Sequence, residues 1–154
     1  MRPLVSAWKD RGQRALAHEV ANVIANMVER PSAAALAFVP RDGDRSVKRG
    51  YHPAEQIARE LSQCWDLPLI GALGRTRAPK RQRGLSLGER RRNVAGTFTA
   101  KGRVPGSLVL VDDVYTTGST ASAAASALRR AGARRVEVVT FARAVRSIES
   151  SQRS

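Results

Sequence analysis

Two adjacent carboxylates, Asp112 and Asp113, follow directly on a run of four aliphatic residues. A short turn rich in hydroxyl groups comes next, and its residues are Thr116, Thr117, Gly118, Ser119 and Thr120. Hydroxyl groups and the unpaired backbone N–H groups at the start of a helix can bind a phosphate. Carboxylates can accept hydrogen bonds from vicinal sugar hydroxyls, stabilise a developing positive charge, or hold a divalent ion directly or through water. The stretch therefore predicts a site for a sugar phosphate.

Two other interpretations of this stretch follow from the residue types alone. It could be a buried strand that ends in solvated acids, followed by an ordinary helix N-cap. It also looks like the aspartate-bearing strand of a P-loop ATPase, but a P-loop needs a lysine directly after its second glycine. Gly118 is followed by Ser119 and Thr120, and the P-loop pattern occurs nowhere in the chain. Because several independent features coincide, we favour the sugar-phosphate site.

The elements that must position these residues alternate along the chain. Apolar residues at helical spacing predict helices over residues 15–28, 52–64 and 119–131. Short aliphatic runs predict strands over residues 34–39, 67–70, 108–111 and 136–142. Unbroken aliphatic strands that alternate with helices favour an α/β fold, in which helices flank a parallel twisted sheet. Ligands bind such sheets at the carboxyl ends of the strands, where we expect Pro40 and Arg41 to join Asp112 and Asp113.

Composition bounds the class of protein. The chain has 154 residues, 42% hydrophobic and 26% charged, which fits one folded domain over residues 1–154 with a frayed polar tail after residue 146. No apolar run approaches the ~20 residues needed to cross a bilayer, and the N-terminus lacks the apolar core of a signal peptide. Cys64 is the single cysteine, so the chain has no internal disulfide and no cysteine-based zinc cluster. We expect a cytoplasmic location.

Positive charge dominates the sequence, with 23 arginines, 4 lysines and a net charge of +14. From Arg75 to Arg103 there are ten basic residues and one acid, Glu89. Such a field attracts phosphate esters, nucleotides or nucleic acid, although a composition bias that favours solubility explains the bulk charge equally well. Residues 74–103 have weak periodicity, and a loop of this length is usually functional or disordered.

The stretch from residue 108 to residue 120 closely resembles the 5-phosphoribosyl-1-pyrophosphate (PRPP) motif of type I phosphoribosyltransferases. That motif is an aliphatic strand, two acids and a Thr-Gly-x-Thr loop. Two further segments narrow the resemblance to the ComF family. The first, similar to R-x-x-x-R-G-[FY]-N-x-A-E, consists of Arg45, Arg49-Gly50-Tyr51 and Ala54-Glu55. The second, similar to G-L-S-x-x-E-R-x-x-N-V-x-G-x-F, consists of Arg83-Gly84-Leu85-Ser86, Glu89-Arg90, Asn93-Val94, Gly96 and Phe98.

The resemblance implies a type I phosphoribosyltransferase fold with a mobile loop. It implies transfer of ribose 5-phosphate from PRPP to a nitrogen nucleophile with release of pyrophosphate. Asp112 and Asp113 would be the catalytic pair that holds the ribose hydroxyls, and they would hold Mg²⁺ through ribose or water. The turn from Thr116 to Thr120 would bind the 5-phosphate. The residues expected around pyrophosphate are Pro40, Arg41, Arg45, Arg49 and Arg90, with residues 75–96 as the mobile lid. Type I enzymes are frequently dimers, so we expect a homodimer.

The chain departs from the family pattern at three places. Many ComF-like proteins begin with a cysteine-rich module, and we expect this chain to lack it. His52 stands where the family usually has asparagine, and we expect it to serve at the start of a helix. We expect His18 to be a surface or core residue rather than a ligand. Thr116 stands where hypoxanthine-type relatives have an aspartate, and a hydroxyl is a poor general base, which disfavours purine salvage.

Two other functions stay open, and no segment identifies the acceptor. ComF-like proteins are associated with DNA uptake, so the fold could serve a non-enzymatic protein that binds single-stranded DNA. The arginine excess suits such a groove, but aromatic residues that could stack on bases are few. The chain could also be a regulator that senses PRPP without turnover, and release of pyrophosphate would separate that function from an enzyme.

Overall fold

A three-stranded parallel sheet forms the centre of the fold. The computed structural model describes residues 2–41, 52–76, 97–115 and 118–143. The strands of the sheet are β1 (Ala35–Phe38), β4 (Ser107–Tyr115) and β5 (Arg135–Arg143), in the order β1-β4-β5. Val111 of β4 pairs with Phe38 on one side and with Val139 on the other. The parallel sheet that the aliphatic runs predict is therefore confirmed.

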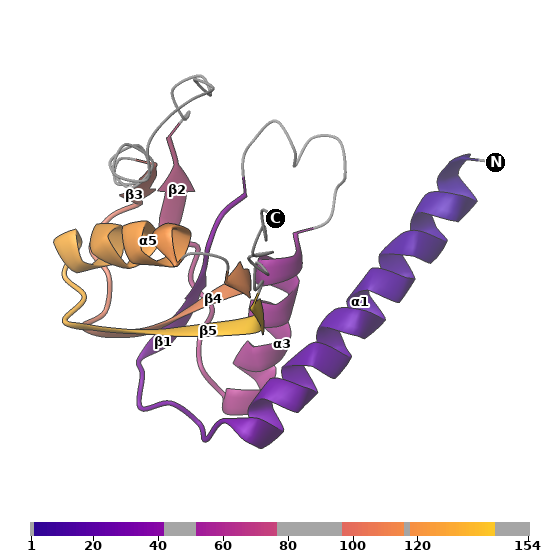
Figure 1. Cartoon of the computed structure of the whole chain (residues 1–154), viewed down its shortest axis with the longest axis horizontal. Helices are drawn as coiled ribbons and strands as arrows, with labels where there is room; N and C mark the ends of the chain where they lie inside the picture. The colour runs from indigo at the N-terminus through magenta and orange to yellow at the C-terminus, as the bar shows by residue number, and fades with distance from the viewer. Residues whose placement is uncertain (1, 42–51, 77–96, 116–117, 144–154) are drawn as a thin grey trace, which may run out of the picture.

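Helices cover both faces of this sheet (Figure 1). They are α1 (Arg2–Met27), α3 (Pro53–Trp65) and α5 (Ser119–Arg130). Leu108 and Leu110 of the middle strand lie in the core with α5, whereas Val109 and Val111 lie in the core with α1 and α3. All four side chains are fully buried, because successive residues of a strand point to opposite faces and both faces are covered.

The first helix differs from the prediction in its length and in its buried face. It begins at Arg2 instead of residue 15, since the preceding residues are mostly good helix formers and Pro3 is tolerated in a first turn. Its core side is made by Ala17, Val20, Ala21 and Ile24. Among the apolar residues that predict the helix, Leu16, Val23 and Met27 are exposed. Small alanines let α1 approach α3 closely, so the larger side chains at neighbouring positions face outward.

Two short strands form a second sheet within the segment expected to be a loop. β2 (Leu73–Arg75) and β3 (Phe98–Ala100) are antiparallel partners, and Leu73 and Phe98 are buried in the core that contains α5. The prediction of a loop over residues 74–103 is therefore wrong at both of its ends. Three residues are too few for a strand period to be read from sequence. The expected mobile lid, residues 75–96, lies mostly outside the described residues.

The strand predicted over residues 67–70 is also wrong, because only an isolated parallel bridge forms there. Leu69 pairs with Leu36 of β1, and Leu36 donates its backbone N–H to the carbonyl of Pro68 at 2.8 Å. The backbone N–H of Ile70 donates to the carbonyl of Leu36 at 2.9 Å. This segment thus lies along the outer side of β1 without extending the sheet by a full strand.

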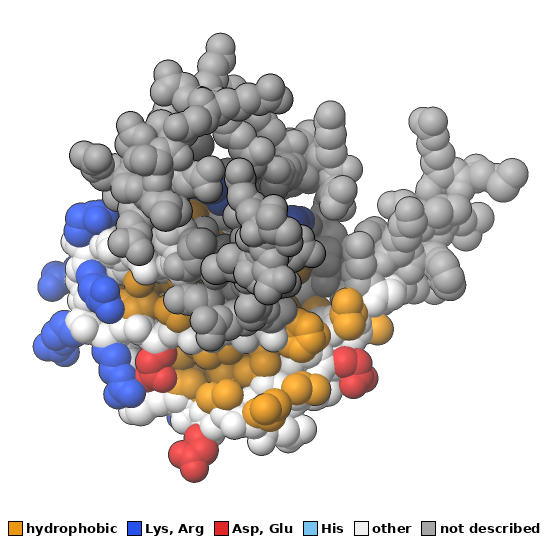
Figure 2. All heavy atoms as spheres, in the orientation of Figure 1, with side chains coloured by type: hydrophobic (Ala, Val, Ile, Leu, Met, Phe, Trp, Pro, Cys, Tyr) orange, Lys and Arg blue, Asp and Glu red, His pale blue; other side chains and the backbone are white. Residues whose placement is uncertain are grey.

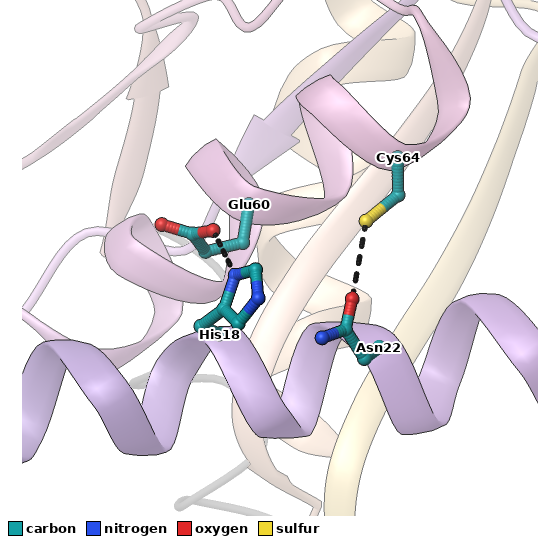
Figure 3. A network of polar contacts seen from close by, with 4 residues as sticks. All are labelled: His18, Asn22, Glu60 and Cys64. Atoms are coloured by element: carbon teal, nitrogen blue, oxygen red, sulfur yellow. Dashed lines mark hydrogen bonds and ion pairs between the residues drawn. The ribbon is translucent and has the colours of Figure 1, made fainter.

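Polar contacts join α1 to α3 on their solvent side (Figure 3). His18 Nδ1 lies 2.8 Å from Glu60 Oε2, and this hydrogen bond raises the pKa of the His18 ring. Cys64 Sγ donates to Asn22 Oδ1 at 3.8 Å. His18 therefore has the structural role expected of it. Within the described residues, no helix combines the length and apolar character needed to span a membrane.

Candidate functional site

The two acids lie on a strand and not after its end. β4 continues beyond the predicted residue 111 to Tyr115, because β5 pairs with it along the way, with Asp112 opposite Thr140. Side chains alternate along a strand, so Asp112 faces the same side as Leu110 and Asp113 faces the same side as Val111. Asp112 therefore faces the layer with α5 and β2, and Asp113 faces the layer with α3. The pair occupies the carboxyl end of the middle strand from both faces.

Burial and mutual repulsion shape the charge of this pair. Asp112 is only 7% exposed, and burial, together with the hydrogen bond and the negative charge of Asp113, raises the Asp112 pKa to about 6. The backbone N–H of Asp113 donates to Asp112 Oδ1 at 3.0 Å, and this bond together with the positive charge of Arg75 opposes the rise. A cation or a developing positive charge beside the pair would favour its fully ionised form.

Arg75 of β2 is part of this site, although the sequence placed it at the start of the lid. Its Nη1 donates to the carbonyl oxygen of Pro40 at 3.4 Å. Its guanidinium carbon lies 5.1 Å from the centre of the Phe98 ring, a cation–π contact. Arg75 thus connects the second sheet to the residues after β1. The sequence did not predict the contact of Arg75 with Pro40, because this contact depends on pairing between β2 and β3, which are far apart in the chain.

The residues after β1 lie beside the middle strand. The backbone N–H of Val39 donates to the carbonyl of Val111 at 2.9 Å, which brings Pro40 and Arg41 to the edge of the sheet that carries Asp112. The backbone N–H of Arg41 donates to His52 Nε2 at 3.1 Å. This arrangement confirms that the carboxyl ends of the first and middle strands meet at one edge.

His52 starts α3 as the N-cap, which confirms the role expected of it. Its Nδ1 accepts from the backbone N–H of Glu55 at 3.3 Å, and its ring makes an edge contact with Phe38, with ring centres 5.3 Å apart. Burial lowers the His52 pKa, and the Arg41 charge acts in the same direction. The charges of Glu55 and Asp113 oppose this shift. Burial at this position therefore favours the neutral ring over the charged one.

The N-terminus of α5 has the geometry of an anion site. Gly118, its N-cap, has a left-handed backbone with φ of 72°, which glycine adopts without a steric penalty. Glycine has no side chain with which to cap the helix, so the first N–H groups of α5 depend on other acceptors. Ser119 and Thr120 form the first turn and are half-buried. The positive end of the helix dipole lies there too.

The described part of the chain brings together seven of the predicted site residues at one edge of the sheet: Pro40, Arg41, Asp112, Asp113, Gly118, Ser119 and Thr120. The other predicted residues, Arg45, Arg49, Arg90, Thr116 and Thr117, lie outside the described residues.

Within the described ranges, no cluster of three or more His, Cys, Asp or Glu side chains could hold a metal. Because Asp112 and Asp113 face opposite sides of β4, they do not form one closed donor set, and each carboxylate fits Mg²⁺ only with water or ligand oxygens to complete its shell.

Comparison with known proteins identifies the family of this chain. A family model for the phosphoribosyl transferase domain matches residues 47–153. The chain is 37% identical over 115 residues to competence protein F of Haemophilus influenzae, covering 71% of this chain and 50% of that protein. It is 38% identical over 108 residues to DNA utilization protein YhgH of Escherichia coli (strain K12), covering 67% and 46%. The chain thus spans about half the length of these relatives.

Solved structures support the fold. The structure described as the allosteric regulatory enzyme of purine biosynthesis matches with a TM-score of 0.54 at 20% identity, over 83% of this chain and 26% of that one. A hypoxanthine phosphoribosyltransferase from Staphylococcus aureus matches with a TM-score of 0.53 at 11% identity, over 90% and 71%. With the sheet, the acidic pair and the α5 turn in place, the chain belongs to the phosphoribosyl transferase domain family, and competence protein F and YhgH are among its relatives.

Proposed function

We propose that this chain binds PRPP with Mg²⁺ and transfers its ribose 5-phosphate to a nitrogen nucleophile. The observation that carries the proposal is the position of the Asp112–Asp113 pair between the N-terminus of α5 and the residues after β1. One end of this edge suits a phosphate monoester, and the middle suits ribose hydroxyls. Arg41 and Arg75 supply positive charge near the place where pyrophosphate would lie.

In this proposal each residue acts on a defined part of PRPP. The backbone N–H groups after Gly118, with the hydroxyls of residues 116–120, hold the 5-phosphate and fix the ribose against slippage. Asp112 and Asp113 accept hydrogen bonds from the ribose hydroxyls. Pro40, Arg41, Arg45, Arg49 and Arg90 are the proposed pyrophosphate contacts. Asp112 and Asp113 would hold Mg²⁺ directly or through water, and the ion would supply charge neutralisation for the leaving pyrophosphate.

The proposed reaction is a substitution at the anomeric carbon. The bond from this carbon to pyrophosphate breaks, and the pyrophosphate oxygen takes the electron pair. The nitrogen nucleophile forms the new bond and then loses a proton to water. Positive charge develops on the ribose while the leaving group departs, and the ionised acids at the ring stabilise that charge.

The first test is a thermal-shift series with Mg²⁺ and PRPP. A ligand at about 100 times its Kd stabilises a protein by about 2.7 kcal/mol, which should raise the Tm by about 5–10 °C for a chain of this size. Inorganic phosphate alone should give a much smaller shift. A screen of amines and bases for pyrophosphate release then separates an enzyme from a PRPP sensor. No change in Tm with millimolar Mg-PRPP would contradict the proposal.

A second candidate function, binding of single-stranded DNA, is favoured by a separate basic edge. We define this edge by six exposed cations: Lys101, Arg103, Arg129, Arg130, Arg134 and Arg135. They lie at the amino ends of β4 and β5 and at the C-terminus of α5, opposite the acidic pair, and Figure 2 shows basic side chains gathered there. Backbone bonds from Arg134 to Gly106 and from Val104 to Ala131 hold the segments together.

This basic edge has little compensating charge among the described residues. Glu137 forms an ion pair with Arg135 at 2.8 Å. A hollow of about 340 Å³ lies beside the edge, between β3 and α5, with Arg130 in its lining. Arg129 and Arg130, in the last turn of α5, also complement the helix dipole, so their presence has a structural reason as well. The names of the relatives, which refer to competence and DNA utilization, support a role with DNA.

If the basic edge binds single-stranded DNA, affinity should fall steeply as salt is added. Each phosphate contact contributes a slope of about −0.7 in log K against log salt. Arg103→Gln with Arg134→Gln should reduce that slope by about 1.4 and leave the Mg-PRPP shift unchanged. Arg59→Gln, which removes an exposed cation on α3, is the matched control. Binding that salt does not affect, or no binding in fluorescence anisotropy, would remove this candidate.

A further inference from the structure

His52 makes contacts with two segments that meet at the candidate site. The backbone nitrogen of Arg41 lies 3.1 Å from Nε2 and that of Glu55 lies 3.3 Å from Nδ1, so each N–H faces a ring nitrogen that can accept it when that nitrogen carries no proton. The ring is half-buried against Phe38, the last residue of β1. One side chain therefore links the segment after β1 to the first turn of α3.

A neutral imidazole has one nitrogen that donates and one that accepts. The two backbone N–H groups therefore compete for a single acceptor, and the ring satisfies one of them at a time. Full protonation would place N–H groups against both backbone donors, so neither contact would survive. Among the described residues, three charged groups act on the ring: Arg41 on the segment after β1, Glu55 on α3 and Asp113 on β4.

The segment after β1 is held from its other side as well. Arg75 Nη1 donates to the carbonyl of Pro40, while the next residue, Arg41, donates its backbone N–H to His52. The Pro40–Arg41 peptide region is thus fixed by one contact from the second sheet and one from the start of α3. Loss of either contact leaves backbone rotation at Arg41 less restricted.

We infer that His52 is a positioning residue, which acts through its Nε2 acceptor to hold the Arg41 backbone in the shape that receives pyrophosphate. The identity of the ligand in this inference rests on the proposed function. The contact between His52 and the Arg41 backbone does not. The Nδ1 contact serves the helix, and the Nε2 contact serves the site. The two roles can therefore be separated by placing an acceptor at only one of the two positions.

Two substitutions make that separation. His52→Asn places a carbonyl oxygen near the Nδ1 position, so it keeps the helix cap and loses the Arg41 contact. His52→Gln can place its oxygen near the Nε2 position, so it keeps the Arg41 contact and loses the cap. We expect His52→Asn to weaken Mg-PRPP binding by about three- to tenfold with little change in Tm. We expect His52→Gln to retain binding within about twofold while its ligand-free Tm falls by about 2–4 °C.

Titration of Mg-PRPP into the full chain by calorimetry gives the binding side of the test. Equal affinity in all three proteins overturns the inference, and so does an equal loss in both variants, which would point to ring packing on Phe38 instead. If the unsubstituted protein shows no response to Mg-PRPP, the proposed function fails and NMR decides the contact. Amide hydrogen exchange at Arg41 should then be faster in His52→Asn than in His52→Gln; equal rates, or the opposite order, overturn the inference.

Discussion

Replacing Asp112 with asparagine should make the ligand-free protein more stable and should at the same time remove most of its response to Mg-PRPP. The Asp112 carboxyl is buried and its pKa is raised from 3.8 to about 6. One pKa unit corresponds to about 1.4 kcal/mol, so the charged form costs the fold up to about 3 kcal/mol at neutral pH. Asparagine has nearly the same shape, carries no charge and can still accept from the Asp113 N–H. Loss of a charged hydrogen bond to the ligand should weaken binding by about ten- to a hundredfold.

The pH dependence of this effect has a definite sign. The folded state binds more protons at Asp112 than the unfolded state between pH 3.8 and about 6. The cost of the charge is therefore fully present above about pH 6 and disappears as the pH falls toward 3.8. The lowered His52 pKa acts in the opposite sense, since its cost grows as the pH falls below 6.5. Both proteins carry His52, so its contribution cancels in the difference between them.

Urea unfolding of the two proteins from pH 4 to pH 8 measures this difference, and thermal shifts with Mg-PRPP measure binding. The gain in stability should be largest near pH 8 and vanish near pH 4. Asp66→Asn is the matched control, because it removes an acid at the far end of α3, where asparagine also tolerates the left-handed backbone. Adding Asp113→Asn should abolish the remaining ligand response. A lower stability of Asp112→Asn at pH 8, or an unchanged ligand shift in the double variant, would refute the assigned roles.

Replacing Phe98 with alanine should destabilise the protein by about 3–5 kcal/mol. Phe98 is 1% exposed and lies in the core between β3 and α5, so its loss leaves a cavity. Since whole domains are stable by about 5–15 kcal/mol, this single change could remove much of the total. The ring also supports the Arg75 guanidinium, so the substitution should weaken Mg-PRPP binding in whatever fraction remains folded.

Phe98→Leu separates the two effects of the ring. Leucine keeps most of the apolar volume and should cost less than about 1.5 kcal/mol. It offers no π face, so the cation–π contact, which contributes about 0.5–1 kcal/mol, is lost in both variants. Urea unfolding should give a clearly higher free energy of unfolding for Phe98→Leu than for Phe98→Ala. Both variants should bind the ligand more weakly than the unsubstituted protein. Equal destabilisation by the two substitutions would argue against a well-filled core at this position.

The sheet and the site edge follow from the sequence because they depend on runs of residues. Val109 and Val111 sit in an unbroken aliphatic segment, and such a segment has few ways to be buried other than as a central parallel strand. The acids and Gly118 follow in the same short stretch, so their proximity can be predicted without knowing how distant segments pair. Pro40 and Arg41 meet them because parallel strands end at a common edge.

The features that the sequence did not reveal depend on pairing between distant segments. Arg75 reaches Pro40 only because Leu73 pairs with Ala100, across a stretch with no readable period. The extension of β4 through Asp112 depends on pairing with Thr140 of β5. The sequence of residues 108–111 alone carries no information about this pairing. The orientation of α1 depends on alanines, which carry a weak hydrophobic signal but permit the closest approach between helices.

The exposed thiol of Cys64 has a practical consequence for work in solution. It is the single cysteine of the chain, it lies near the end of α3, and its contact with Asn22 is long. A maleimide dye or a spin label would therefore attach at one known point, on the opposite face of the sheet from Asp112 and Arg75. The same accessibility lets two chains become joined by oxidation. Any dimer seen without a reducing agent must consequently be re-examined with one before it counts as subunit association.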